Sequence, residues 1–220
     1  MLHTTSRFAI GAAIFSIASV FAMADGHDAN PVPSGSRPCT MLREIPVGKE
    51  AYAPEAAKLV ELGIPEKYGH EEWAAVVLSH ELHQHVGIYT LIGAKMAVFA
   101  RETLRAPMRA VHATVETGRQ QPHSCMVDGI QVGLASTLGQ NLIDVPETSH
   151  PKLAATFKYK ARTIRVSLKP EYEERIRAII KDSVQKHGNL TPEYFEAVEQ
   201  ASFGVWADFD RTEVFEVEEK

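Results

Sequence analysis

The chain has 220 residues and a formal net charge of −5 at neutral pH, and 45% of its residues are hydrophobic. This length suits one domain with a substantial core, apart from any targeting segment. A mildly acidic chain that lacks a basic stripe is unsuited to binding nucleic acid. We therefore expect no nucleic-acid partner.

The first 24 residues have the pattern of a secretory signal peptide. Arg7 precedes an apolar run from Phe8 to Phe21, and no acidic residue occurs before Asp25. Residues 22–24, Ala-Met-Ala, fit the small-x-small pattern of a cleavage site. We expect a protein that is secreted across the inner membrane and resides in the periplasm.

The segment that follows the signal peptide predicts a leader ahead of a folded domain. Residues 25–37 are rich in Gly, Pro, Ser and Asn and show no hydrophobic periodicity, which is typical of a disordered segment. Residues 38–220 are expected to form the domain. No stretch of the mature chain approaches the roughly 20 apolar residues of a transmembrane helix, so we expect no membrane-spanning segment.

Three amphipathic helices are predicted in the first half of the domain. Pro54 suits a first helical turn, and Gly63 followed by Ile64-Pro65 is a stop signal. Two further segments show apolar residues at helical spacing. The three predicted helices cover residues 54–62, residues 71–78 and a segment that begins after Gly87 and ends near Arg105.

Three histidines, His80, His83 and His85, lie within six residues just before the third of these helices. Clustered imidazoles indicate a metal site first and acid/base chemistry second. In a continuous helix His83 and His85 would point about 200° apart, so they converge only if the chain turns between them. Gln84 stands where a zincin motif needs its second histidine, which excludes that motif. The simpler alternative is a solvated, histidine-rich helix end.

The two cysteines that follow the signal peptide, Cys39 and Cys125, allow two interpretations that exclude each other. In an oxidising compartment they could form a disulfide, which would stabilise the fold by about 4 kcal/mol. Alternatively, Cys125 lies in the first turn of a helix predicted from Val127, Ile130 and Leu134, where the helix field favours a metal-binding thiolate.

The remaining pattern predicts strands and helices of an α+β fold, with an antiparallel sheet packed against helices. The clearest β signal, residues 152–168, changes the parity of its apolar positions near Arg162-Thr163, which requires a turn or bulge. The acidic tail alternates apolar and charged residues as an edge strand does. Further strands are predicted at residues 109–116, 141–145 and 213–220, and helices at residues 171–186 and from residue 191.

Two motifs resemble those of the FmdE-like domain family, which is named after formylmethanofuran dehydrogenase. The segment from Glu81 to Gly87 occupies the place of the family's His-Gly-His-x-Cys-Pro-Gly signature. The run Cys125-Met-Val-Asp128-Gly-Ile-Gln131, followed by Thr137-Leu-Gly-Gln-Asn141, matches the second and more specific signature. The resemblance covers residues 71–219.

This resemblance implies an α+β domain that binds zinc or a similar divalent transition metal and forms a homodimer. Carried over residue by residue, the implied metal ligands are His83, His85 and Cys125. His85 stands where the family has cysteine, and Glu81 replaces the family's first histidine. A His/His/Cys set suits zinc, copper or nickel, and we expect zinc.

Three classes of function follow from these observations. The first is a metal-binding protein of the cell envelope that acts as carrier, sensor or scavenger, with Asp128 or His123 supporting the ligands. The second is a metalloenzyme that acts on a small molecule, with Asp128 or His80 transferring protons. The third is a structural domain that is locked by a disulfide between Cys39 and Cys125.

Overall fold

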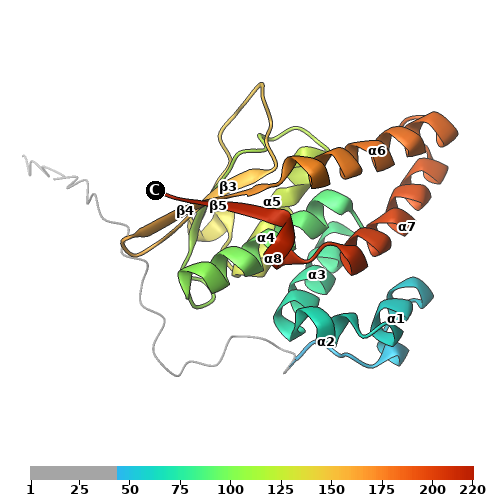
Figure 1. Ribbon diagram of the computed structural model, residues 1–220, viewed down its shortest axis with the longest axis horizontal. Coiled ribbons are helices and arrows are strands. Elements are labelled where there is room, and N and C mark those ends of the chain that lie inside the picture. The colour runs from blue at the N-terminus through green and yellow to red at the C-terminus, as the bar shows by residue number, and fades with distance from the viewer. Residues whose placement is uncertain (1–43) are drawn as a thin grey trace, which may run out of the picture. The chain divides into compact units, whose positions relative to one another are not determined.

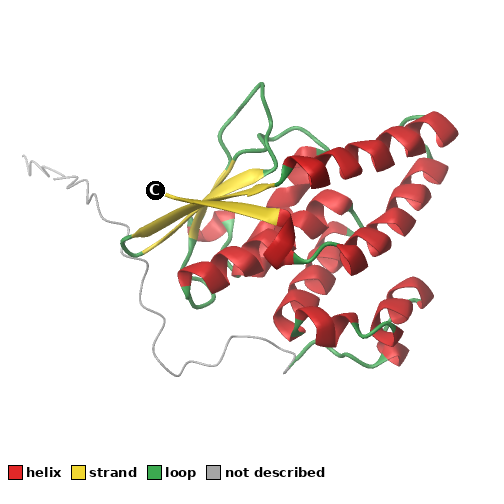
Figure 2. Ribbon diagram, viewed as in Figure 1, coloured by secondary structure: helices red, strands yellow, loops and turns green. Residues whose placement is uncertain are grey.

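The computed structural model describes residues 44–220, and the predicted signal peptide, the predicted leader and Cys39 lie outside the described residues. The described chain is an α+β domain with a five-stranded sheet on one side and helices on the other (Figures 1 and 2). The predicted fold class is therefore confirmed. The helices are α1 (Pro54–Glu61), α2 (Ile64–Tyr68), α3 (His70–His83), α4 (Ile88–Leu104), α5 (Met126–Leu134), α6 (Pro170–His187), α7 (Pro192–Asp208) and α8 (Arg211–Val214).

The sheet has the strand order β2-β1-β3-β4-β5 and is mixed. Three of its neighbouring pairs are antiparallel as expected, whereas β2 lies parallel to β1. The connection from β1 to β2 runs through α5, and such a helical crossover returns the chain in the same direction. The expectation of an antiparallel sheet was wrong for this edge alone. The strands are β1 (His112–Val115), β2 (Ile143–Asp144), β3 (Ala154–Tyr159), β4 (Arg162–Leu168) and β5 (Phe215–Glu219).

Two elements differ from the expected pattern because of local backbone geometry. Gly63 does end α1, but Pro65 then lies in the first turn of a new short helix, α2. The change of parity in the long β segment comes from a turn just ahead of the predicted place, where Lys160 adopts a positive φ of 53°. The predicted pair of adjacent strands and the predicted edge strand at the end of the chain are confirmed.

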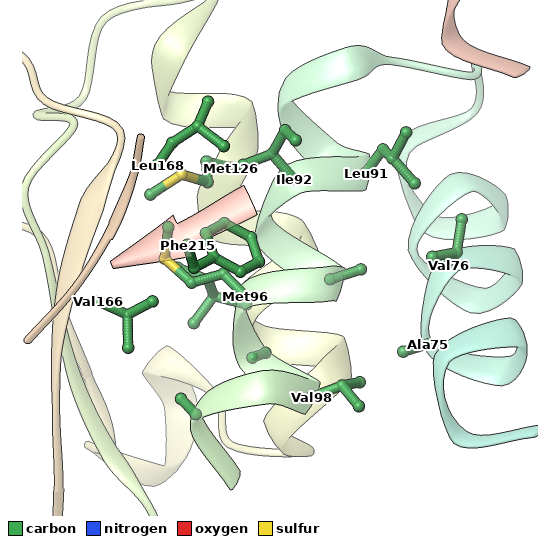
Figure 3. Close-up of a cluster of buried hydrophobic side chains, with 14 of the residues drawn as sticks. Ala75, Val76, Leu91, Ile92, Met96, Val98, Met126, Val166, Leu168 and Phe215 are labelled. Carbon is green, nitrogen blue, oxygen red and sulfur yellow. The ribbon is translucent and has the colours of Figure 1, made fainter. Parts of the chain in front are cut away.

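Helix α4 is the centre of the core. Leu91, Ile92 and Met96 of this helix are completely buried, and Figure 3 shows α4 between α3 on one side and the sheet on the other. Val166 of β4 and Phe215 of β5 close the core from the sheet side (Figure 3). A helix that is apolar around most of its circumference is typical of such a position.

Helices α4 and α5 touch through their backbones. A Cβ atom added to Gly129 of α5 would overlap the carbonyl oxygen of Thr90, and one added to Gly93 of α4 would overlap that of Met126. One turn further along α5, a Cβ on Gly133 would lie 2.6 Å from the Cβ of Ala97. Glycine is therefore required at this crossing for steric reasons.

A buried charged cluster joins α3 and α4 to the last turns of the chain. The ammonium of Lys95 donates to Glu72 at 2.5 Å and to the carbonyl oxygen of Phe209 at 2.7 Å, and it lies 4.0 Å from the ring centre of Tyr68. Arg211 of α8 donates to the second oxygen of Glu72 at 3.1 Å. Removing one partner would leave an unpaired buried charge, which costs about 3–5 kcal/mol.

Gly129→Ala should destabilise the protein by about 1–3 kcal/mol, because the added methyl group has no room between the two backbones. Gly204→Ala is the matched control, since a Cβ at this exposed position of α7 would meet no atom within 4 Å. The control should be neutral or should stabilise by about 0.5–1 kcal/mol through helix propensity. Urea unfolding of both variants measures the difference, and equal stabilities would contradict the close crossing.

Candidate functional site

The chain turns between His83 and His85, as the spacing of these two residues required. Helix α3 ends at His83, Gln84 adopts a left-handed conformation with φ 62°, and Gly87 is the N-cap of α4. The turn brings the two imidazole rings together, with their centres 4.4 Å apart. The prediction of a loop at this junction is confirmed.

The second half of the site comes from the start of α5. A short 3-10 helix at His123–Cys125 leads directly into α5, so that Cys125 is the N-cap and Asp128 lies in the first turn. Asp128 Oδ2 lies 2.8 Å from Nδ1 of His83, which is 45 residues away in sequence. The close crossing of α4 and α5 places the start of α5 beside the histidine loop that leads into α4.

His83 is the residue that the other side chains of the site contact. The hydrogen bond from Nδ1 to Asp128 is the main reason why the pKa of His83 is raised to about 9, and an interaction with the Cys125 thiol adds to this rise. The other ring nitrogen, Nε2, is buried and has no hydrogen-bond partner among residues 44–220. A buried polar atom without a partner is costly, so this nitrogen is the place where a ligand would be most stabilising.

The two other histidines of the cluster differ from His83. Burial, together with the charge on His83, lowers the pKa of His85. Burial lowers the pKa of His80 to about 4, and its Nε2 lies 3.4 Å from the carbonyl oxygen of Gly87. His80 is therefore neutral at physiological pH and is turned toward the backbone of the loop.

The structure brings together the three predicted metal ligands, since His83 interacts with both His85 and Cys125. Within residues 44–220, however, no three His, Cys, Asp or Glu side chains are arranged closely enough to hold a metal ion as they stand. Cys125 is a free thiol. The alternative disulfide with Cys39 is not placed, because Cys39 lies outside the described residues.

Of the two predicted supporting residues, only Asp128 contacts a ligand. The ring of His123 lies against Tyr89 instead, with a distance of 5.1 Å between ring centres. Tyr89, whose pKa burial raises to about 12, was not predicted from the sequence. Neither was Phe195 of α7, whose ring centre lies 6.1 Å from that of His85. Tyr89 could have been noticed, because it lies in the first turn of the helix that follows the histidines.

The family comparison matches the part of the chain that contains this site. A sequence model of the family described as "FmdE, Molybdenum formylmethanofuran dehydrogenase operon" matches residues 82–207, which is more than half of the chain. The chain belongs to the FmdE family. The matched range includes all four residues of the site, His83, His85, Cys125 and Asp128, so the site lies within the part that defines an FmdE domain.

Among solved structures, an FmdE-like protein of tungsten formylmethanofuran dehydrogenase from Syntrophus aciditrophicus is similar to this chain. The two are 19% identical, with a TM-score of 0.41, over 64% of this chain and 67% of the other. No curated protein matches the sequence. In this FmdE domain, none of the helices in residues 44–220 has the length and apolar character that crossing a membrane requires.

Asp128→Asn should lower the pKa of His83 from about 9 toward its ordinary value near 6.5 in metal-free protein. Because the folded protein binds this proton more tightly, the proton stabilises the fold fully below pH about 6.5. This stabilisation is lost as the pH rises through about 9. NMR titration of the imidazole signals measures the shift. Asp144→Asn, next to the exposed pair of His112 and Asp144, is the control, and an unchanged His83 in Asp128→Asn would contradict the contact.

Proposed function

We propose that this FmdE-family protein is a metal-binding protein of the cell envelope, which acts as carrier, sensor or scavenger of zinc or a similar transition metal. The proposed ligands are His83, His85 and Cys125. The observation that carries the proposal is the state of His83, whose Nδ1 is held by a carboxylate while its buried Nε2 has no partner among the described residues.

This pairing is the usual arrangement around a metal-bound histidine. A carboxylate that accepts the N–H of one ring nitrogen fixes the tautomer and orients the other nitrogen toward the metal. Asp128 would have this role, and its position on α5 next to Cys125 ties the thiol and the imidazole to the same helix end. The donor set of two imidazoles and one thiolate is typical of zinc.

Metal binding also requires a small rearrangement. His85 and Cys125 are already next to His83, so a change of their side-chain rotamers, rather than of the backbone, would bring their donor atoms toward His83 Nε2. His85 is half-buried, and burial lowers its pKa, so that this ring is neutral and available as a ligand. When bound, a metal with three protein ligands keeps one open position, at which water or a small molecule can bind.

A metalloenzyme is the second candidate, and one feature of the site favours it. Tyr89 and His123 form a pair of polar rings near the proposed ligands, and the pKa of His123 is lowered by burial. A neutral imidazole near an open metal position could accept a proton from a bound molecule. His123 would supply this group rather than Asp128, which is engaged by His83.

The metal content of untagged mature protein tests the proposal. Elemental analysis should give close to one metal ion per chain, and His83→Ala/His85→Ala should lose it. The matched control is His150→Ala/His187→Ala, which removes two exposed histidines far from the cluster in sequence and should keep the metal. Equal and negligible metal in all three proteins would refute the ligand assignment.

A thiol count separates the metal site from the disulfide-locked alternative. Denatured but unreduced protein has two reactive thiols if Cys39 and Cys125 are both free, and none if they form a disulfide. The proposal predicts two thiols, with Cys125→Ser also losing metal. A protein with no reactive thiol and no metal would support the structural domain instead.

Residence in the cell envelope is proposed from the signal-peptide pattern of residues 1–24 and has its own test. The protein should appear in the periplasmic fraction, and N-terminal sequencing should give a chain that begins at Asp25. Replacing Ala22 and Ala24 by bulky residues should block cleavage. Recovery of the uncleaved chain in the cytoplasm of wild-type cells would contradict this localisation.

A further inference from the structure

A hollow separate from the proposed ligands lies beside the last turns of α3. It has a volume of about 190 Å³ and lies between the segment that contains Tyr52 and the start of α1, the last turns of α3, and α7. None of His83, His85 and Cys125 lines it. A second hollow of about 290 Å³ adjoins it and shares the walls formed by Tyr52, Val77 and Glu81.

Trp206 forms part of the wall and has an unmet hydrogen-bonding need. Its side chain is 3% exposed, and one face of the indole stacks on Trp73 with 4.7 Å between ring centres. The indole N–H is buried and has no acceptor among residues 44–220. A buried indole N–H normally finds a partner, so an acceptor atom within the hollow would remove an energetic penalty.

The charge of the lining is entirely negative. The carboxylates of Glu55, Glu81 and Glu199 come from three different helices, and none of them forms a salt bridge among the described residues. The described lining contains no Lys or Arg. His80 also lines the hollow, but burial lowers the pKa of this histidine to about 4 and keeps it uncharged at neutral pH.

The remaining lining is aromatic and small. Tyr52, Phe203 and Trp206 contribute ring surface, and Val77, Val86 and alanines supply the rest. Ring faces attract organic cations, and the attraction is stronger where water is excluded. The volume is below the roughly 300–1,000 Å³ of sites for drug-sized ligands, which points to a molecule of few atoms.

We propose that this hollow binds a small organic cation that carries an oxygen acceptor, with the cation near Glu81 and Glu199 and the oxygen accepting from the indole N–H of Trp206. Trimethylammonium alcohols such as choline have this chemistry. The site is separate from the metal proposed above, so metal binding and cation binding can fail independently.

Isothermal titration calorimetry of the full mature protein tests the proposal with three probes. Choline should bind, and its neutral isostere 3,3-dimethylbutan-1-ol should bind at least about tenfold more weakly because it lacks the charge. Tetramethylammonium has the charge without the oxygen, so it should bind roughly five- to tenfold more weakly than choline. No heat with millimolar choline would overturn the proposal, as would equal binding of the isostere.

Two variants locate the site. Glu199→Gln should weaken choline roughly tenfold, whereas Glu196→Gln, an exposed residue of the same helix outside the hollow, should leave it unchanged. Trp206→Phe keeps an aromatic ring but removes the N–H, so it should weaken choline and spare tetramethylammonium. Circular dichroism checks the fold of Trp206→Phe. Should that variant unfold, the comparison of Glu199→Gln with Glu196→Gln still decides, and equal affinities in these two would overturn the proposal.

Discussion

The candidate site depends on the backbone contact between α4 and α5. These helices cross near their N-terminal ends, where Gly93 and Gly129 leave no room for a Cβ atom. The crossing sets the position of Asp128, and through it the distance to His83 at the end of α3. A larger residue at the crossing would push the start of α5 away and lengthen the hydrogen bond between Asp128 and His83. The geometry of the histidine cluster is therefore fixed by the packing of two helices behind it.

The middle of α4 is held by charge instead of close backbone packing. Lys95, Glu72 and Arg211 form a cluster that is almost completely shielded from water, and Phe209 contributes a carbonyl oxygen. Such a cluster adds little net stability over apolar residues, but each partner tolerates only a narrow geometry. It ties the last turns of the chain to α3 and α4 and so positions the end of α7, which carries Trp206 into the wall of the hollow.

Local sequence signals predicted most of the elements and the residues of the cluster. Helical spacing identified α4 to α7, and alternation identified β3, β4 and the edge strand β5. The need for a turn between His83 and His85 followed from their spacing alone, because a continuous helix cannot bring them together. The family motifs then connected them to Cys125. These inferences all depend on neighbouring residues or on a family's pattern of spacing.

Features that depend on tertiary contact were not predictable in this way. The parallel pairing of β2 follows from how α5 crosses the sheet, and the burial of Lys95 follows from which helix faces it. The partner of His83 could not be chosen between Asp128 and His123 until the helices were placed. The hollow beside Trp206 has no sequence motif, since its carboxylates come from three helices. Gly129 and Gly133 did carry a signal, because small residues four apart on a helix indicate close packing.

The edge of the sheet limits how two copies of this protein can associate. Strand β5 has β4 as its neighbour on one side and forms the end of the sheet in the described chain. It carries the exposed Glu216, Glu218 and Glu219, so pairing with a second copy of the strand would bring carboxylates together without compensating charge. Extension of the sheet from one molecule to the next is thus electrostatically unfavourable. The helical surface, where Leu78 and Leu82 of α3 are exposed, suits the homodimer expected from the family resemblance better than this edge does.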